Sequence, residues 1–191
     1  MVKRILGVLL LRSAAYREIA KDPAATRQAA VIVVLSTLVF GFFEGFIVTD
    51  TPPSVVRLSL SGGLSEALAR VIPGLIIWAV VAWILAFLVK LLKGETNAGE
   101  MLRITGYAQA FGILAVLGIL ALTSPSLAGI GALFTLLVGF LSLLATIIGI
   151  VEVSGISTGK AFFAALVTEA ITLVFTIAAA TLLLRLLKLG G

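Results

Sequence analysis

Long apolar runs alternate with short polar segments along most of this chain. Each run is close to the ~20 residues that a helix needs to cross a hydrocarbon layer of about 30 Å. The pattern predicts an all-α, polytopic membrane protein with five transmembrane helices, in which residues 1–191 form a single membrane domain. The five predicted spans cover approximately residues 29–48, 71–92, 107–123, 127–151 and 161–184.

The first residues have a different, amphipathic pattern. At helical spacing one face carries Val2, Ile5, Val8, Leu9, Tyr16 and Ile19, and the opposite face carries Lys3, Arg17, Glu18 and Lys21. This pattern is typical of a helix that lies in the membrane interface, so we expect an N-terminal amphipathic interfacial helix over residues 2–21. Arg12 falls on the apolar face and has to reach the head groups or a partner. A signal peptide is the alternative, but its apolar core would be short and Arg12 would end it.

Turn-forming residues separate the segments. Asp22 followed by Pro23 predicts the start of a helix, with Asp22 as its cap. A Pro-Pro pair and a Ser-Gly-Gly stretch predict that residues 49–70 form a loop, with room for a short helix after Ser65. Residues 155–161 superficially resemble a phosphate-binding loop, but three residues instead of four separate the glycines and no hydroxyl residue follows the lysine. We therefore interpret them as a tight turn.

Composition excludes several classes of function. Hydrophobic residues make up 61% of the chain and charged residues only 12%, against about 45–50% and about 25% in soluble domains. There is no cysteine and no histidine, so thiolate chemistry, the commonest general base and the usual metal ligand are all missing. We expect no enzymatic activity, no cofactor and no metal. The net charge is +5, and most of the basic residues lie beside the apolar runs. This placement indicates anionic lipids rather than nucleic acid as the partner.

The basic residues also predict an orientation. Five spans place the two termini on opposite sides of the membrane. The side of the N-terminus then carries most of the lysines and arginines, which favours a cytoplasmic N-terminus and an outer C-terminus in a cell membrane. Those on the N-terminal side are Lys3, Arg4, Arg12, Arg17, Lys21, Arg27, Lys90, Lys93, Arg103 and Lys160, against Arg57, Arg70, Arg185 and Lys188 on the other.

Small and hydroxyl residues form stripes within the predicted spans. Such residues let helices approach closely and form hydrogen bonds across the contact, so we interpret the stripes as packing seams of a helical bundle. The stripes are Thr135, Gly139, Ser142, Thr146, Gly149 and Glu152 in the fourth span, Thr37, Gly41 and Glu44 in the first, and Glu169, Thr172 and Thr176 in the fifth.

Glu169 stands apart because it lies about nine residues, or roughly 13 Å, inside the fifth span. A carboxylate at such depth costs at least ~2.5 kcal/mol, and no lysine or arginine lies within the predicted hydrocarbon core to pair with it. Two interpretations stay open. Glu169 is a protonated packing residue in a dry seam, or it forms a proton or cation site with Thr172 that faces a wet polar cavity.

The junction between polar and apolar sequence at residues 94–123 carries a family resemblance. Asn97 can cap a helix with Glu100 placed three residues on, and Arg103 follows at the water boundary. The pattern Arg103-x-x-Gly106-Tyr107-Ala108 resembles the YIP family of five-span membrane proteins, whose eukaryotic members interact with Ypt/Rab GTPases. The Tyr-Arg-Glu-Ile segment at 16–19 with the Asp-Pro pair after it, and Gly-Lys-Ala at 159–161, are also similar to that family.

The resemblance implies a non-enzymatic integral membrane protein that acts as a scaffold or organiser of membrane proteins or lipids. We expect Glu100, Arg103 and Tyr107 to take part in its inner-face contacts, with lipids, other membrane proteins or a second copy as partners. The chain lacks the Asp-Leu-Tyr-Gly-Pro motif of eukaryotic members, so GTPase binding is not expected and a prokaryotic YIP-domain relative is indicated. The alternative is a small transporter or channel subunit with a proton or cation site at Glu169.

Overall fold

The computed structural model describes residues 1–50, 55–122, 124 and 126–189. In this part of the chain, helices dominate and one short two-stranded antiparallel hairpin connects two of them. The elements are α1 (Val2–Leu9), α2 (Ser13–Lys21), α3 (Ala25–Phe46), β1 (Ile47–Asp50), β2 (Val55–Leu58), α4 (Leu60–Leu91), α5 (Ala98–Ala108), α6 (Ala110–Leu122), α7 (Ala128–Ser154) and α8 (Thr158–Leu189).

Among the described residues, five segments are long and apolar enough to cross a membrane, which confirms the all-α, multi-pass prediction. They are Ala25–Phe46, Leu60–Leu91, Ala98–Gly118, Ala128–Ser154 and Thr158–Phe175. Each predicted span overlaps one of these five helical segments. The third begins earlier than predicted, because Asn97 and Glu100 form the predicted capping box and start α5 at Ala98.

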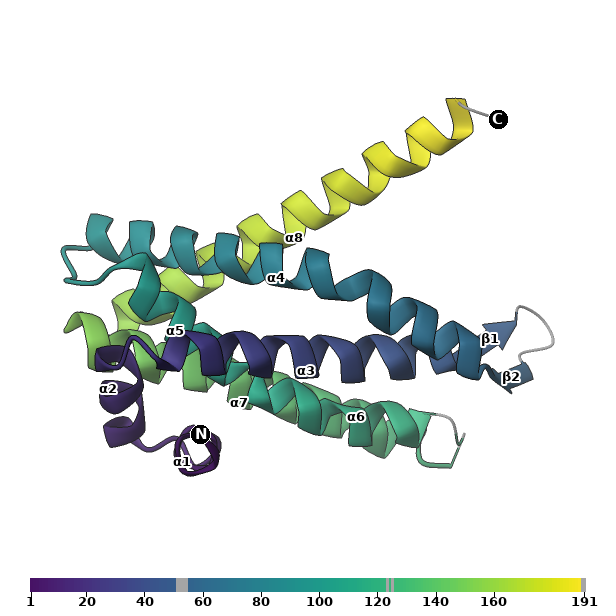
Figure 1. Ribbon diagram of the computed structural model, residues 1–191, viewed down its shortest axis with the longest axis horizontal. Helices are drawn as coiled ribbons and strands as arrows, with labels where there is room; N and C mark the ends of the chain where they lie inside the picture. Colours follow the sequence, from purple (N-terminus) through teal and green to yellow (C-terminus); the bar gives the residue numbers. More distant parts are fainter. Residues whose placement is uncertain (51–54, 123, 125, 190–191) are drawn as a thin grey trace.

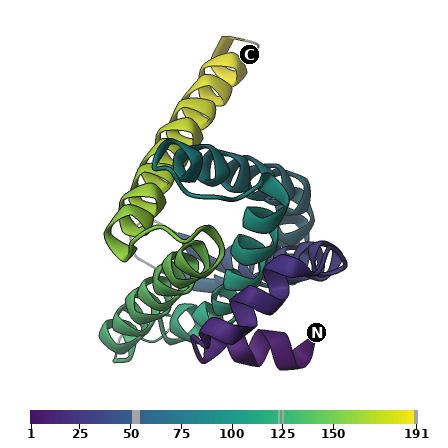
Figure 2. The same ribbon diagram turned by 90° about the vertical axis from the view of Figure 1, so that its left-hand side faces the viewer.

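The helices form an elongated bundle (Figure 1). α1, α2 and the turns before α5 and α8 lie at one end, and the β-hairpin and the turn between α6 and α7 lie at the other. α3 packs along α4, and α6 packs along α7. α8 contacts α4 and α7 near its start and then leaves the bundle, as Figure 2 shows in the view from the α1–α2 end.

The predicted loop over residues 49–70 is wrong from Leu60 onward, where α4 begins with Ser59 as its cap, and the short helix allowed after Ser65 belongs to α4. The glycines that suggested a turn serve a helix contact instead. A Cβ atom on Gly45 would lie 2.5 Å from the Gly62 carbonyl oxygen, and one on Gly62 would lie 2.6 Å from that of Gly45. In lipid, close backbone approach of this kind is what holds helices together. The Pro-Pro pair lies outside the described residues.

The predicted single helix over residues 2–21 is also wrong. The chain turns between α1 and α2, with Leu11 in the left-handed region at φ 52°. The turn folds α1 back on α2, so that a Cβ atom on Gly7 would lie 2.6 Å from the Ala15 Cβ. The Tyr16 hydroxyl donates to the Val8 carbonyl (3.3 Å). The break brings Arg12 into an exposed turn, whereas an unbroken helix would hold it in the apolar face.

The apolar residues of these two helices form part of the core of the bundle. Val8, Tyr16 and Ile19 are fully buried, and α2 packs against α5 and α7. Burial raises the pKa of the Tyr16 hydroxyl, so the group stays neutral. The N-terminal segment is therefore docked on the bundle by one face, in addition to any contact that it makes with lipid.

The stripe of the fourth span packs against neighbouring helices at both of its ends. A Cβ atom on Gly118 would collide with the Thr135 hydroxyl, and one on Gly149 would collide with Ile104. Glu152 pairs with Arg17 of α2 (3.1 Å). Gly139 is the exception, because no described residue of another helix comes within 4 Å of the Cβ position there.

Candidate functional site

Glu100 stabilises the first turn of α5. Its backbone N–H donates to the Asn97 side-chain oxygen (2.9 Å), and its carboxylate accepts hydrogen bonds from the Asn97 N–H (3.1 Å) and the Thr96 hydroxyl (2.9 Å). Such reciprocal caps satisfy backbone donors that the helix itself leaves free. The structure thus gives Glu100 a local role at the start of α5.

Arg103 connects three helices. Its guanidinium donates to the Ala20 carbonyl (2.6 Å) near the end of α2 and to the Thr26 hydroxyl (3.3 Å) at the start of α3. Its Nε is buried without a partner in the described part of the chain. Arg103 therefore uses its charge to hold α2 and α3 against α5.

Tyr107 belongs to the same assembly. It is fully buried, and its hydroxyl donates to the Gln28 side-chain oxygen. Arg4 of α1 also donates to that oxygen (3.4 Å) and forms ion pairs with Glu18 (2.9 Å) and Asp22 (2.7 Å). The Arg4 guanidinium and the Ala24 N–H hold the pKa of the Asp22 carboxyl below its usual range. This network joins α1, α2, α3 and α5.

The sequence pattern indicates a role for Tyr107, but it does not indicate that Arg4 and Gln28 share a site with it. Both residues look like ordinary polar positions at the end of a span, and no local pattern shows that they meet. Exposed basic side chains surround the docked helices at the same end of the bundle. They belong to Lys3, Arg12, Arg17, Lys21, Arg27, Lys90, Lys93 and Lys160.

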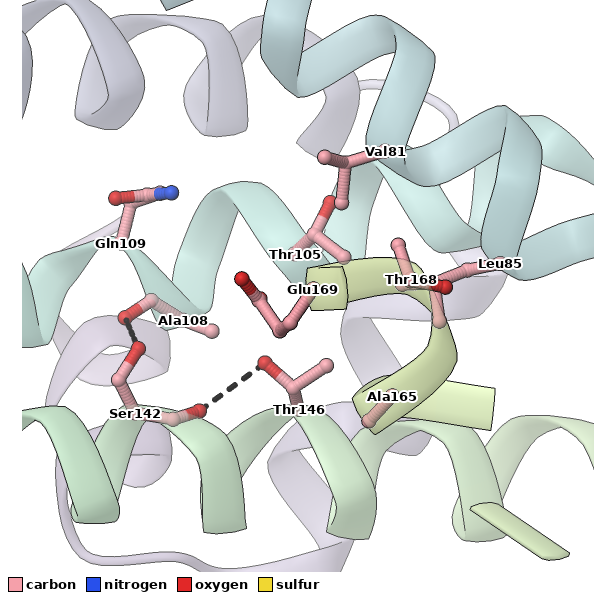
Figure 3. A pocket seen from close by; sticks show the side chains of 10 residues that line it. All are labelled: Val81, Leu85, Thr105, Ala108, Gln109, Ser142, Thr146, Ala165, Thr168 and Glu169. Carbon is pink, nitrogen blue, oxygen red and sulfur yellow. Dashed lines mark hydrogen bonds between the residues drawn. The ribbon is translucent and has the colours of Figure 1, made fainter. Parts of the chain in front are cut away.

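Glu169 lies at the other candidate site, between α8 and three other helices. Its side chain extends toward α5 and α7 (Figure 3). It lines a cavity of about 70 Å³ together with Val81 and Leu85 of α4. The remaining walls are largely polar and include Thr105, Gln109, Ser142, Thr146 and Thr168.

A second cavity of about 230 Å³ also reaches Glu169. Thr172 lines it, so the structure brings together the two residues that the sequence analysis paired. Gln109 lines both cavities and a third of about 310 Å³, which extends to Arg70. Arg70 is paired with Glu44 (2.8 Å) and Glu66 (2.6 Å).

Gln109 was missed in the sequence analysis, although the signal was present as a polar residue inside the third apolar run. It lies between α5 and α6, where the helix of the third span is interrupted. The arrangement offers oxygen atoms and one carboxylate to a bound species. No group of three or more Asp, Glu, His or Cys residues that could hold a metal ion occurs in the described residues.

The fold and these sites define a class: a multi-pass helical membrane protein with a docked, basic N-terminal helix pair and a polar cavity between its spans. The model of one family, the Yip1 domain, matches residues 6–180. The chain therefore belongs to the Yip1 family, which confirms the resemblance in the sequence. Comparisons with curated proteins and with solved structures found no match.

Proposed function

We propose that this protein is a non-enzymatic organiser of the membrane, whose α1–α2 end lies at the cytoplasmic face of a prokaryotic cell membrane and gathers anionic lipids. The observation that carries the proposal is the docking of α1 and α2 by the Arg4 and Arg103 contacts, with the surrounding lysines and arginines left exposed. An anionic surface attracts each such residue by about 1 kcal/mol.

The outer face of α1 supports contact with lipid. Val2, Leu6 and Leu10 follow one another at four-residue steps and are 68%, 53% and 60% exposed. The exposed side chain of Lys3 lies beside them in the sequence. A helix with an apolar stripe and basic flanks sits in the interface with that stripe in the acyl boundary. α1 thus offers one face to the protein and another to the bilayer.

Glu100, Arg103 and Tyr107 act in this proposal as positioning residues. Each holds α1, α2, α3 or α5 in place, so their loss disturbs the basic surface without removing a contact to lipid. This differs from the direct contact role that the sequence suggested. The proposal also includes neighbouring membrane proteins and a second copy of this chain as partners. They would bind the same anionic lipids that this protein gathers.

Electron paramagnetic resonance of spin-labelled lipids around the reconstituted protein tests the proposal. The wild type is expected to prefer phosphatidylglycerol over phosphatidylcholine. In the triple variant Lys21→Gln, Lys90→Gln, Lys93→Gln, the relative affinity for phosphatidylglycerol over phosphatidylcholine is expected to fall by about tenfold or more. The reason is that each removed charge loses roughly 1 kcal/mol of attraction to the anionic lipid. Glu95→Gln is the matched control at the same end, because it removes an exposed acid and is expected to keep or strengthen the preference. An equal preference in the wild type and the triple variant contradicts the proposal.

A second candidate function, transport of a proton or cation, is favoured by a separate observation. Glu169 lines two cavities to which threonine, serine and glutamine side chains also contribute, which is the setting that a proton or cation site needs. Flux of protons, Na⁺ or K⁺ into proteoliposomes, compared between the wild type and Glu169→Gln, tests it. Equal flux through both, at the level of protein-free vesicles, contradicts it.

A further inference from the structure

We propose that the cavity beside Glu169 is a binding site for one alkali cation, Na⁺ or K⁺, with oxygen ligands supplied at the break in the third span. The Glu169 site comprises the Glu169 carboxylate, the Ala108 carbonyl, the Gln109 side chain, and the hydroxyls of Ser142 and Thr146. This inference rests on the second candidate function, cation transport, and names the ion that would be transported. Binding of the ion is tested separately from its flux across the membrane. It is independent of the lipid-binding surface.

The break in the third span leaves a carbonyl group for the site. In an unbroken helix the Gly112 N–H would donate to the Ala108 carbonyl, four residues back. Here it donates to the Gln109 carbonyl (2.9 Å). The Ala108 carbonyl accepts only a long bond from the Ser142 hydroxyl (3.5 Å) among the described residues, and Ala108 lines the cavity. Irregular backbone at membrane depth is tolerated where it lines such a cavity.

The hydroxyl groups present lone pairs rather than protons. Thr105 donates its proton to the Met101 carbonyl (2.7 Å), and Thr146 donates to the Ser142 carbonyl (3.0 Å). Ser142 directs its proton toward the Ala108 carbonyl (Figure 3). Each oxygen keeps acceptor capacity after this bond. No hydrogen-bond donor to the Glu169 carboxylate occurs in the described part of the chain. Gln109 carries amide donors as well as an acceptor oxygen, but the other polar groups around the carboxylate present oxygen lone pairs, and such a lining suits a positive ion.

The charge of the site favours a monovalent ion. Glu169 is the sole ionisable residue among those that line the two cavities next to it. Arg70, in the third cavity, is already paired with Glu44 and Glu66. One carboxylate balances one Na⁺ or K⁺, whereas a divalent ion would leave a net positive charge in a medium of low dielectric constant. Oxygen ligands are those that hard cations prefer.

Three adjoining cavities suggest the direction from which a cation reaches the site. The cavity that Arg70 lines shares Thr37 and Gln109 with the next, and that one shares Thr105, Gln109 and Glu169 with the smallest. The three cavities therefore follow one another from Arg70, which lies toward the β-hairpin end of the bundle, to Glu169. Gln109 lies along the whole route. A cation is expected to arrive from the side of the membrane on which the hairpin lies.

The thermal stability of the purified full chain in Na⁺, in K⁺ and in N-methyl-D-glucamine, at constant ionic strength, tests the proposal. Ligand binding to the folded state raises the midpoint of unfolding with the logarithm of concentration. Each tenfold rise in Na⁺ or K⁺ above its Kd is expected to raise the midpoint by about 3–5 °C. Lowering the pH by one unit is expected to weaken the apparent affinity by up to tenfold, because protons compete for Glu169.

Two variants locate the effect. Glu169→Gln is expected to abolish the cation dependence, and Glu95→Gln, which removes an exposed acid outside the Glu169 site, is expected to retain it. Ser142→Ala serves if Glu169→Gln does not fold, and is expected to weaken the apparent affinity several-fold. A wild type whose stability is the same in all three cations overturns the proposal. A cation dependence that persists in Glu169→Gln, or that disappears equally in Glu95→Gln, overturns it as well.

Discussion

At the scale of single residues, charge in this protein is used mainly to join helices. Arg103 spans from α5 to the ends of two other helices, and Arg4 holds two acids of the α1–α2 pair. Arg17, by contrast, forms an ion pair with Glu152 in which its own side chain is 57% exposed. Exposed pairs of this kind contribute about 0–1 kcal/mol, so the half-buried contacts matter more.

Arg103→Gln is expected to loosen the docking of α2 on α5. The substitution removes charge-assisted hydrogen bonds, each worth roughly 1.5–3 kcal/mol, and leaves the Ala20 carbonyl without its donor. Hydrogen exchange is expected to become at least about tenfold faster in residues 2–21 while the amides of α7 change little. Arg17→Gln is the control and is expected to alter exchange less than about fivefold. If both variants exchange alike, Arg103 does not have the positioning role given to it.

At the scale of elements, contacts between helices depend on glycine in a way that is particular to membranes. Gly41 faces the α4 backbone, with its Cβ position 3.0 Å from the Ala67 Cα, and the Gly45–Gly62 contact is closer still. Gly139, on the exposed side of α7, has no such neighbour. Glycine thus marks a helix contact at some positions and open space at others.

Gly45→Ala is expected to destabilise the protein, because its methyl group would lie 2.5 Å from a backbone oxygen of α4. Overpacking of this type costs roughly 1–3 kcal/mol, so we expect the midpoint of thermal unfolding to fall by several degrees. Gly139→Ala is the matched control and is expected to keep or raise the midpoint, since alanine favours a helix over glycine by up to about 1 kcal/mol. Equal midpoints for the two variants would show that the α3–α4 contact is looser than described.

The elements also show what sequence reasoning can reach. Apolar runs of span length predicted the transmembrane helices, and Asn97 with Glu100 predicted the start of α5, because both signals are local. The Ser-Gly-Gly stretch misled, since glycine serves both turns and close helix contacts. The turn at Leu11 went unseen because the helical periodicity of apolar residues continues through it. The turn is accompanied by the close fit of Gly7 against Ala15, a contact between segments that no local pattern shows.

The candidate site at Glu169 also contains residues that the sequence predicted and residues that only the fold shows. Glu169 could be predicted from its depth in an apolar run, since a carboxylate within the hydrocarbon region of a membrane is costly. Gln109 and the Ala108 carbonyl were not found. Their role depends on a helix break that no proline marks, and on three other helices that converge beside it. The sequence showed that Glu169 needs a partner, while the fold shows which oxygen atoms lie near it.

At the scale of the whole molecule, the two ends of the bundle differ in character. One end holds the docked α1–α2 pair, the turns before α5 and α8, and the exposed basic residues. The other holds the β-hairpin and the turn between α6 and α7. We propose that the basic end faces the cytoplasm and the hairpin end faces the outside, because an excess of lysine and arginine favours the inner side of the membrane.

Labelling of single introduced cysteines in intact cells tests this arrangement most directly, since the chain has no cysteine of its own. A membrane-impermeant maleimide is expected to label Ser126→Cys and a cysteine added after Gly191 from the outside. Lys3→Cys, Lys93→Cys and Lys160→Cys are expected to react only after the cells are permeabilised. Labelling of Lys93→Cys together with Ser126→Cys in intact cells, or of both chain ends from one side, would contradict the five-span account.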